Sequence, residues 1–404
     1  MSERVVLSFL GLGPKEGYSE TTYVFEDRAV ETDLMPHAVD EVMGPDTLIV
    51  AGTEASNQKY RDKLHSRIEF TSVTVPEGEG EEEWWEIFEV ITEVVPEEAQ
   101  LTIDITHGFR SLPVIALAVA LYLDAVRNVT VDRIIYGAFR PNRDESPILN
   151  LASFLDLIEW TVAARQFLRD GSARGLAALM EEIQNTAHRS QADIKPRNAS
   201  SAAAQLKGLT QALSVVRPEE VSEERIADLQ KALQAVREDA ERVPKLRPLT
   251  VLLDRIQERI DPMQTTTLFG EEGFAAQAEM MRFYLKTEQL QQAITLAREA
   301  MISYQALEMG LNPEPVSKEE WEGCGRDQAA EALGSLANQR DYQSEREKKL
   351  GDLWSMLSEV RNDINHAGMN VEPEDGPTLS GHVEEVVGRV ASYITSKTGS
   401  AQRG

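Results

Sequence analysis

The sequence is poor in cysteine and lacks any apolar run long enough to cross a membrane. The one cysteine, Cys324, excludes an internal disulfide and a cysteine-rich zinc site, so we expect a reducing, cytoplasmic setting. The longest apolar run, residues 112–123, is much shorter than the roughly 20 residues of a transmembrane helix and predicts a buried helix. The first residues lead directly into a strand-like run, without the pattern of a signal peptide.

Basic residues are also scarce relative to acidic ones. Lys and Arg number 41 and Asp and Glu number 68, so the formal net charge is −27. This charge repels polyphosphate at long range and argues against a protein that coats duplex DNA, although it leaves room for a local RNA site. Apolar residues make up 42% of the 404 residues, which is typical of a globular protein with two or three domains of about 150 residues each.

Residues 1–150 alternate between short apolar runs and helical patterns. Runs of this kind that are bounded by glycine are typical of strands buried on both faces of a parallel sheet. The predicted strands are residues 5–10, 46–51, 70–75, 101–106 and 131–136. The βα alternation predicts an α/β, Rossmann-like domain with an open, doubly wound sheet, in which ligands bind beyond the carboxyl ends of the strands.

From about residue 151 the strand patterns stop and helical patterns continue. Helices are predicted over residues 153–170, 222–242 and 274–309 and along an apolar stripe from 350 to 364, with loops at 195–201 and 311–325. These patterns predict an all-α C-terminal region. We therefore divide the chain into an α/β domain over 1–150, a helical connecting region over 151–265 and a second helical domain over 266–404.

The strongest candidate site is the run at residues 104–113, where the fourth predicted strand meets a helix. Ser111 fits the N-cap position, and free backbone N–H groups at a helix start attract anions. Thr106 offers a hydroxyl donor, Arg110 a guanidinium suited to phosphate, and Gly108 close approach to the backbone. These features favour a phosphate-rich or nucleotide ligand over the alternative, an ordinary strand–turn–helix connection whose arginine pairs with a local acid.

The first predicted strand ends in a second candidate loop, which contains Gly11 and Gly13. Glu16 stands where a dinucleotide-binding fingerprint has its third glycine, so a conventional NAD site is not expected. A loop that lets a ligand approach closely remains open. Together with the other strand ends, this loop gives the predicted ligand-binding set: Gly11, Gly13, Thr53, Thr106, His107, Gly108, Arg110, Ser111 and Gly137.

Arg361 and His366 form an Arg-x4-His motif at the end of the last predicted helix. Positions five apart on a regular helix point roughly 140° apart, so the pair converges poorly on one small ion. The two side chains could converge if the helix frays at the histidine or if a second copy of the helix packs against the first. The alternative is a surface arginine and a helix-terminal histidine stabilised by the helix dipole.

The run Asp-Ile-Thr-His-Gly-Phe-Arg-Ser-Leu-Pro at residues 104–113 closely resembles the signature after the fourth strand of CARF domains. On this basis the chain is identified as resembling the CARF–HEPN ribonucleases of type III CRISPR systems, the Csx group. HEPN ribonucleases have Arg-x4–6-His near the C-terminus, often with a polar residue after the arginine, and Arg361, Asn362 and His366 match that pattern. Residues 171–260 match no pattern that we can name.

The resemblance implies a homodimer, or a higher even oligomer, whose paired CARF domains bind a cyclic oligoadenylate, usually the tetra-adenylate. This messenger would switch on cleavage of single-stranded RNA in an antiviral defence, with Arg361, Asn362 and His366 in a composite HEPN site and with no metal or other cofactor. Two rivals remain open: a CARF-type ligand-controlled regulator without nuclease activity, and a Rossmann-like enzyme acting on free nucleotides.

Arg110→Ala is expected to abolish activation by the messenger while the fold stays intact. A charge-assisted contact to phosphate contributes about 1.5–3 kcal/mol, and a symmetric dimer loses two such contacts. Calorimetry with cyclic tetra-adenylate measures the loss of affinity, and circular dichroism checks the fold. Unchanged affinity in the variant would remove Arg110 from the site.

Overall fold

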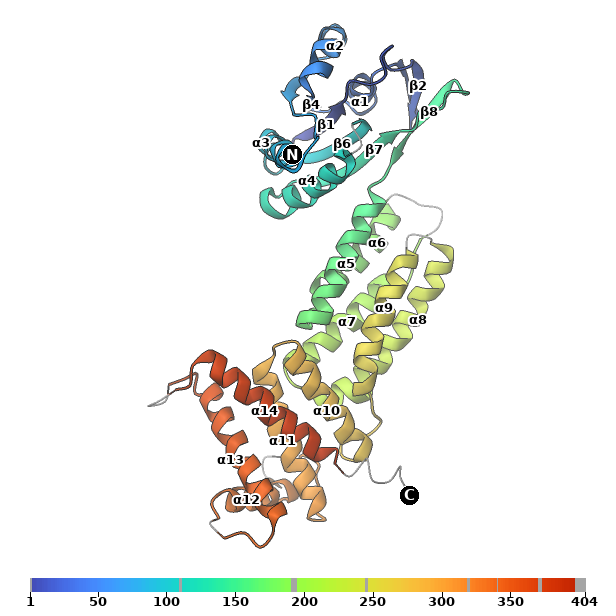
Figure 1. Ribbon diagram of the computed structural model, residues 1–404. Coiled ribbons are helices and arrows are strands. Elements are labelled where there is room, and N and C mark those ends of the chain that lie inside the picture. Colours follow the sequence, from blue (N-terminus) through green and yellow to red (C-terminus); the bar gives the residue numbers. More distant parts are fainter. Residues whose placement is uncertain are drawn as a thin grey trace. The chain divides into compact units, whose positions relative to one another are not determined.

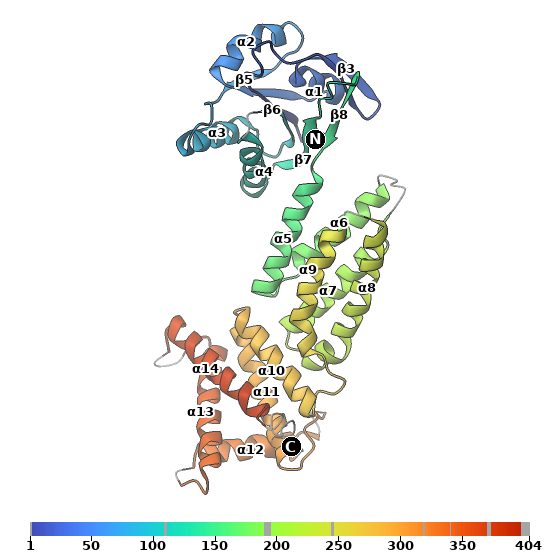
Figure 2. The same cartoon turned by 45° about the vertical axis from the view of Figure 1, so that its right-hand side comes forward.

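The computed structural model describes residues 2–108, 111–189, 195–243, 246–317, 320–339, 341–369 and 373–396. The chain divides into two units, Met1–Asp156 and Leu157–Gly404. Figures 1 and 2 show that the first unit combines a sheet with helices and that the second is helical. The predicted α/β domain followed by a helical region is confirmed, and the further division at residue 265 stays a prediction.

Five parallel strands form one side of the sheet of the first unit, and each overlaps one of the predicted strands. They are β1 (Arg4–Leu10), β4 (Thr47–Gly52), β5 (Thr71–Thr74), β6 (Gln100–His107) and β7 (Thr130–Gly137). The full sheet has eight strands in the order β3-β2-β8-β7-β6-β1-β4-β5. β1 therefore lies between β6 and β4, at the centre of the parallel part.

Helices cover both faces of this sheet, as a doubly wound fold requires. Val5, Leu7 and Phe9 of β1 pack in one apolar cluster with α3 (Glu81–Val94) and α4 (Leu112–Arg127). Val6 and Leu10, on the opposite face, pack in a second cluster with α1 (Met35–Met43) and α2 (Glu54–His65). Because successive residues of a strand point to opposite faces, the uninterrupted apolar run of β1 serves both clusters.

Three further strands extend the sheet beyond β7, and the sequence analysis did not predict them. β2 (Thr21–Phe25) and β3 (Arg28–Thr32) form an antiparallel hairpin, and β8 (Glu145–Asn150) pairs antiparallel with β7 and parallel with β2. β3 is largely exposed and polar in sequence. Such a strand lacks the continuous apolar run that identified the others.

The second unit is a set of helices around one apolar core, and its first helix begins in the α/β unit. Its N-terminal part comprises α5 (Ser153–Asp170), α6 (Arg174–Arg189), α7 (Ala199–Ser214), α8 (Ile226–Arg242) and α9 (Arg247–Ile260). Its C-terminal part comprises α10 (Glu271–Lys286), α11 (Leu290–Glu308), α12 (Gly325–Ala337), α13 (Glu345–Asn365) and α14 (Gly376–Ile394). Among the described residues, no helix is both long enough and apolar enough to span a bilayer.

The structure corrects several predicted helix boundaries. The stretch at 274–309 is two helices, because the chain turns at Glu288, which has a left-handed backbone with φ of 57°. The helix predicted from 222 starts as a π-helical turn, Glu220–Arg225, before α8 begins. Part of the loop predicted at 195–201 belongs to α7. Neither the turn at Glu288 nor the π-helical turn contains glycine or proline, so the sequence pattern did not reveal them.

Leu253→Ala is expected to destabilise the helical unit by about 2–5 kcal/mol, since it leaves a cavity in the core. Leu253 on α9 is fully buried, whereas Val251 on the same helix is 63% exposed. Val251→Ala is the matched control and should change the free energy of unfolding by less than about 0.5 kcal/mol. Urea unfolding followed by circular dichroism measures both; equal effects would contradict the packing of α9 described here.

Candidate functional site

The carboxyl ends of β1, β4 and β6 meet at one edge of the sheet. Leu10, the last residue of β1, lies opposite Gly52 on β4 and His107 on β6. The backbone N–H of Gly11 donates to the carbonyl of His107 at 2.7 Å, which closes the chain against the neighbouring strand just after β1 ends. The predicted strand-end turns therefore lie side by side, as expected for the ligand-binding edge of an open sheet.

A buried carboxylate organises this edge. Asp104 is fully buried and accepts from the Ser8 hydroxyl at 2.5 Å, and from the backbone N–H and hydroxyl of Thr106 at 2.9 and 2.5 Å. The Thr106 oxygen in turn accepts from the backbone N–H of Gly137 at 2.8 Å. Burial raises the pKa of Asp104 to about 6, against the opposing effect of these hydrogen bonds. The network links β1, β6 and β7, and it already uses the Thr106 hydroxyl that was predicted to face a ligand.

Two glycines at the edge are required by close contacts. A Cβ on Gly11 would lie 2.8 Å from the carbonyl oxygen of His107, and one on Gly137 would lie 2.7 Å from the ring of Tyr23. Both distances are shorter than a van der Waals contact. Gly11 therefore allows the loop backbone to approach the carbonyl of His107. Gly137, which is buried, allows the end of β7 to pack against the Tyr23 ring.

His107 lies in the edge but is nearly buried, with 8% of its surface exposed. Its ring stacks on Tyr18 with 3.7 Å between centroids, and its Nε2 has no hydrogen-bond partner among the described residues. Burial lowers the pKa of His107 to about 4, with Asp33 acting in the opposite direction. The imidazole is therefore neutral at physiological pH, and it can contact a ligand only through the small part of its surface that stays exposed.

The remaining predicted residues of the edge have different positions. Thr53 is buried and caps α2, its hydroxyl accepting from the backbone N–H of Ser56 at 3.3 Å. Gly13 is exposed and has a left-handed backbone with φ of 66°, and Gly108 is partly exposed. Ser111 precedes α4, but its backbone is helical and its side chain makes no capping bond, so the predicted N-cap interaction is wrong. Arg110 lies outside the described residues.

Sequence reasoning missed the residues that hold the loop after β1. Lys59 donates to the carbonyls of Leu12 and Pro14 at 3.2 and 2.9 Å, and the Tyr60 hydroxyl donates to Leu12 at 3.0 Å. The Tyr18 hydroxyl donates to the carbonyl of Gly11 at 3.0 Å. These side chains come from α2 and from the loop itself, and no motif in the sequence connects them to the strand ends.

The Arg361–His366 motif lies at the end of α13 in the other unit. His366 is the C-cap residue, its backbone N–H donating to the carbonyl of Asn362 at 2.9 Å, and its side chain is exposed. The Arg361 guanidinium donates to Asn362 Oδ1 at 3.2 Å and, with the Asn365 amide oxygen turned toward it, to Asn365 at 2.7 and 3.1 Å. Two asparagines thus orient the arginine, a role that the sequence analysis did not assign to either of them.

Comparisons with known proteins match two separate segments of the chain. Residues 5–141 match the family model described as CRISPR system endoribonuclease Csx1, CARF domain, and residues 156–263 match CRISPR-associated protein MJ1674, second domain. The first unit is thus similar to the CARF domain of Csx-type CRISPR-associated proteins. The resemblance of residues 104–113 to CARF domains is thereby confirmed, and the second match falls on the segment that the sequence analysis could not name.

The individual relatives are distant. Over 109 residues the chain is 26% identical to CRISPR-associated protein MJ1674 of Methanocaldococcus jannaschii, which corresponds to 26% of this chain and only 17% of that protein. The solved structure of Enterococcus italicus Csm6 bound to cyclic hexa-2′-fluoro-hexa-dAMP aligns with a TM-score of 0.43 at 12% identity, over 98% of this chain and 94% of that one.

The two perturbed groups of the CARF edge are expected to oppose each other in the pH dependence of stability. The pKa of Asp104 rises from 3.8 to about 6 on folding, so its contribution is present below pH 3.8 and is lost as pH rises through 6. The pKa of His107 falls from 6.5 to about 4, so its contribution is present above pH 6.5 and is lost as pH falls through 4.

Single substitutions should uncover these two contributions. Asp104→Asn keeps only the His107 titration, so we expect its unfolding free energy to rise between about pH 4 and 6.5 relative to the double variant. His107→Phe keeps only the Asp104 titration, so we expect its unfolding free energy to fall between about pH 3.8 and 6 relative to the double variant. Urea unfolding at a series of pH values measures the slopes. Slopes of the same sign in the two single variants would contradict the described environments of Asp104 and His107.

Proposed function

We propose that the chain is an endoribonuclease that cleaves single-stranded RNA in type III CRISPR antiviral defence after binding a cyclic oligoadenylate. The observation that supports this most strongly is the match of residues 5–141 to the CARF domain of an endoribonuclease, together with the cluster of turns at the edge of that domain's sheet. The helical unit has an Arg-x4-His motif at an exposed helix end, which supplies an arginine and a histidine suited to RNA cleavage.

The messenger would bind across two copies of the CARF edge, most simply as the tetra-adenylate. A ring of phosphates has rotational symmetry and suits an isologous pair of identical edges. We assign the direct contacts to the turns of Gly11, Gly13 and Gly108, to Arg110 and Ser111, and to the neutral His107. Three residues would act indirectly, because their hydrogen bonds hold α2 and the strand ends in place: Thr53, Thr106 and Gly137.

In the nuclease site, His366 would accept the proton of a ribose 2′-hydroxyl or protonate the leaving 5′-oxygen. The 2′-oxygen would attack phosphorus as the bond to the 5′-oxygen breaks, leaving a 2′,3′-cyclic phosphate and a 5′-hydroxyl. Arg361 would neutralise the charge that develops on the phosphate, and Asn362 would orient that guanidinium. A second copy would supply the second Arg361 and His366, forming a composite site.

This route needs no metal-bound water, because the attacking group is the substrate's own hydroxyl. The described residues contain no group of three or more His, Cys, Asp or Glu side chains arranged to hold a metal. We therefore expect cleavage to proceed in the presence of a chelator.

His366→Ala is expected to remove messenger-dependent RNA cleavage and to leave messenger binding intact. Acid–base catalysis contributes about 10² to 10⁴ in rate, so the loss stands well above background nuclease. Arg361→Ala should behave in the same way. Cleavage of labelled RNA, with and without cyclic tetra-adenylate and chelator, measures the rate, and calorimetry measures messenger binding.

Mixing the two variants tests whether the site is composite. If each site takes Arg361 from one copy and His366 from the other, mixed dimers regain one intact site and part of the activity. If each copy supplies its own pair, mixing restores nothing and the composite arrangement is wrong. A single variant that cleaves RNA at the wild-type rate would overturn the nuclease proposal and favour a ligand-controlled regulator.

A further inference from the structure

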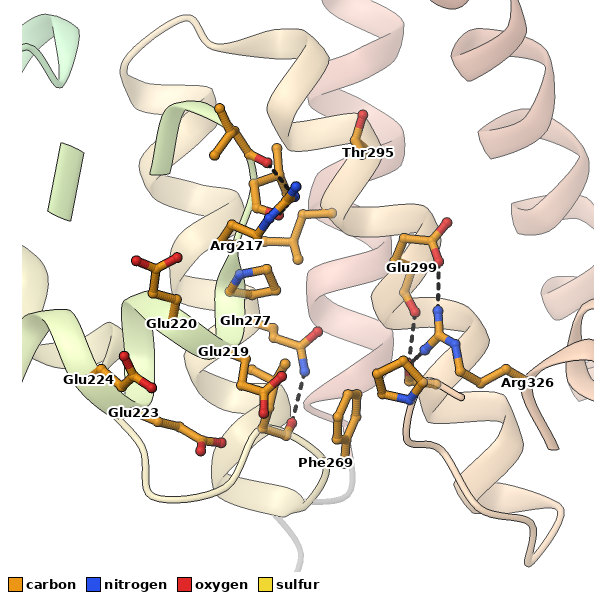
Figure 3. Close-up of a pocket in the computed structure, with 17 residues that line it drawn as sticks. Arg217, Glu219, Glu220, Glu223, Glu224, Phe269, Gln277, Thr295, Glu299 and Arg326 are labelled. Carbon is orange, nitrogen blue, oxygen red and sulfur yellow. Dashed lines mark hydrogen bonds and ion pairs between the residues drawn. The ribbon is translucent and has the colours of Figure 1, made fainter. Parts of the chain in front are cut away.

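The helical unit contains a cavity of ≈ 890 Å³ that is separate from the CARF edge and from the Arg361–His366 motif. Its walls come from the segment that joins α7 to α8, the loop before α10, and helices α10, α11 and α12 (Figure 3). Small-molecule sites usually have volumes of about 300–1,000 Å³. Nothing in the proposed function accounts for this cavity.

Irregular backbone forms one wall of the cavity. Val216 has a left-handed backbone with φ of 54°, which is rare for a β-branched residue, and the π-helical turn Glu220–Arg225 follows it. Arg217 donates to the carbonyl of Val215 at 2.8 Å, and the backbone N–H of Thr265 donates to the carbonyl of Ser222 at 3.2 Å. These bonds hold the wall in an unusual shape that a regular helix would not give.

A buried polar side chain reaches the cavity with one group unused. Gln277 on α10 is 2% exposed, and its Nε2 donates to the carbonyl of Leu268 at 2.9 Å. Figure 3 shows its amide oxygen turned away from that bond and into the cavity. This oxygen has no hydrogen-bond partner among the residues that the structure describes. Because this oxygen opens onto the cavity, the donor of a bound ligand can reach it.

The charges around the cavity are predominantly negative. Five glutamates and two arginines line it, an excess of three negative charges. Glu220 pairs with Arg225 at 2.6 Å, and Glu299 pairs with Arg326 at 2.6 Å. The other three glutamates have no basic partner among the described residues: Glu219, Glu223 and Glu224. Arg217 also lines the cavity and forms no ion pair among the described residues, so it offsets one of these charges. The cavity therefore presents unused acceptors and a net negative charge to whatever enters it.

We propose that this cavity binds a linear aliphatic polyamine. Its ammonium groups would donate to Gln277 Oε1 and to the three unpaired glutamates, and its methylene chain would lie against the apolar side chains of Leu268, Phe269 and Leu296. The Phe269 ring also offers a face that attracts a cation. A single metal ion fits less well, because among the described residues no three acidic or histidine side chains converge on one point.

Spermidine is the probe for this proposal. Calorimetry on the full chain, at fixed ionic strength, should give saturable binding of one spermidine per chain, with no comparable binding of Mg²⁺ or of a neutral diol of similar length. The substitution Glu223→Gln with Glu224→Gln should weaken spermidine binding by at least about tenfold. Both side chains are exposed, so this variant should fold. Gln277→Leu should also weaken binding, with its melting temperature measured alongside.

A matched control separates a built site from general attraction to an acidic protein. Glu238→Gln with Glu241→Gln removes the same charge from exposed positions of α8 outside the cavity lining and should change the affinity by less than about twofold. Equal losses in the two double variants would overturn the proposal, because spermidine would then be a diffuse counterion. Binding of Mg²⁺ or of the diol as tight as that of spermidine would overturn it too.

Discussion

The buried carboxylate of Asp104 is the constraint on which the ligand-binding edge depends. A carboxylate without access to water is tolerated only when its oxygens are hydrogen-bonded, so Ser8 and Thr106 must both be in place. Thr106 then fixes Gly137 at the end of β7. One buried group thus sets the ends of three strands, and the exposed turns that follow β1 and β6 take their positions from those ends.

The sequence predicted β1 and β4 most directly, because each is a continuous apolar run that serves two faces of the sheet, as β1 does with Val5 and Val6. It did not predict β3, whose exposed, polar residues pair only at the sheet margin, or the break at Glu288, where the backbone is left-handed without a glycine. In the site, it predicted which strand ends meet but not what each residue does. Thr53 and Thr106 use their hydroxyls within the protein, and Tyr18 and Lys59 join the edge only through the fold.

The helical unit contains two features, of which only one could be predicted from the sequence. The Arg361–His366 motif is local, so its spacing and its place at a helix end could be predicted, and the structure adds Asn365 as a second partner of the arginine. The cavity is assembled from segments far apart in the chain, among them Glu223 and Gln277, and no spacing in the sequence connects them. Helices α11 and α12, which line the cavity, also contact α13, which bears the motif. The cavity and the motif therefore belong to one continuous apolar core.

The central claim is that a ligand at the CARF edge controls RNA cleavage by the helical unit. The most direct test titrates cyclic tri-, tetra- and hexa-adenylate into the full chain with labelled RNA, and follows binding and cleavage in the same samples. The account predicts that one ring size binds at one molecule per two chains and that cleavage rises in proportion to occupancy. Saturated binding without cleavage, or cleavage that is indifferent to all three rings, would contradict it.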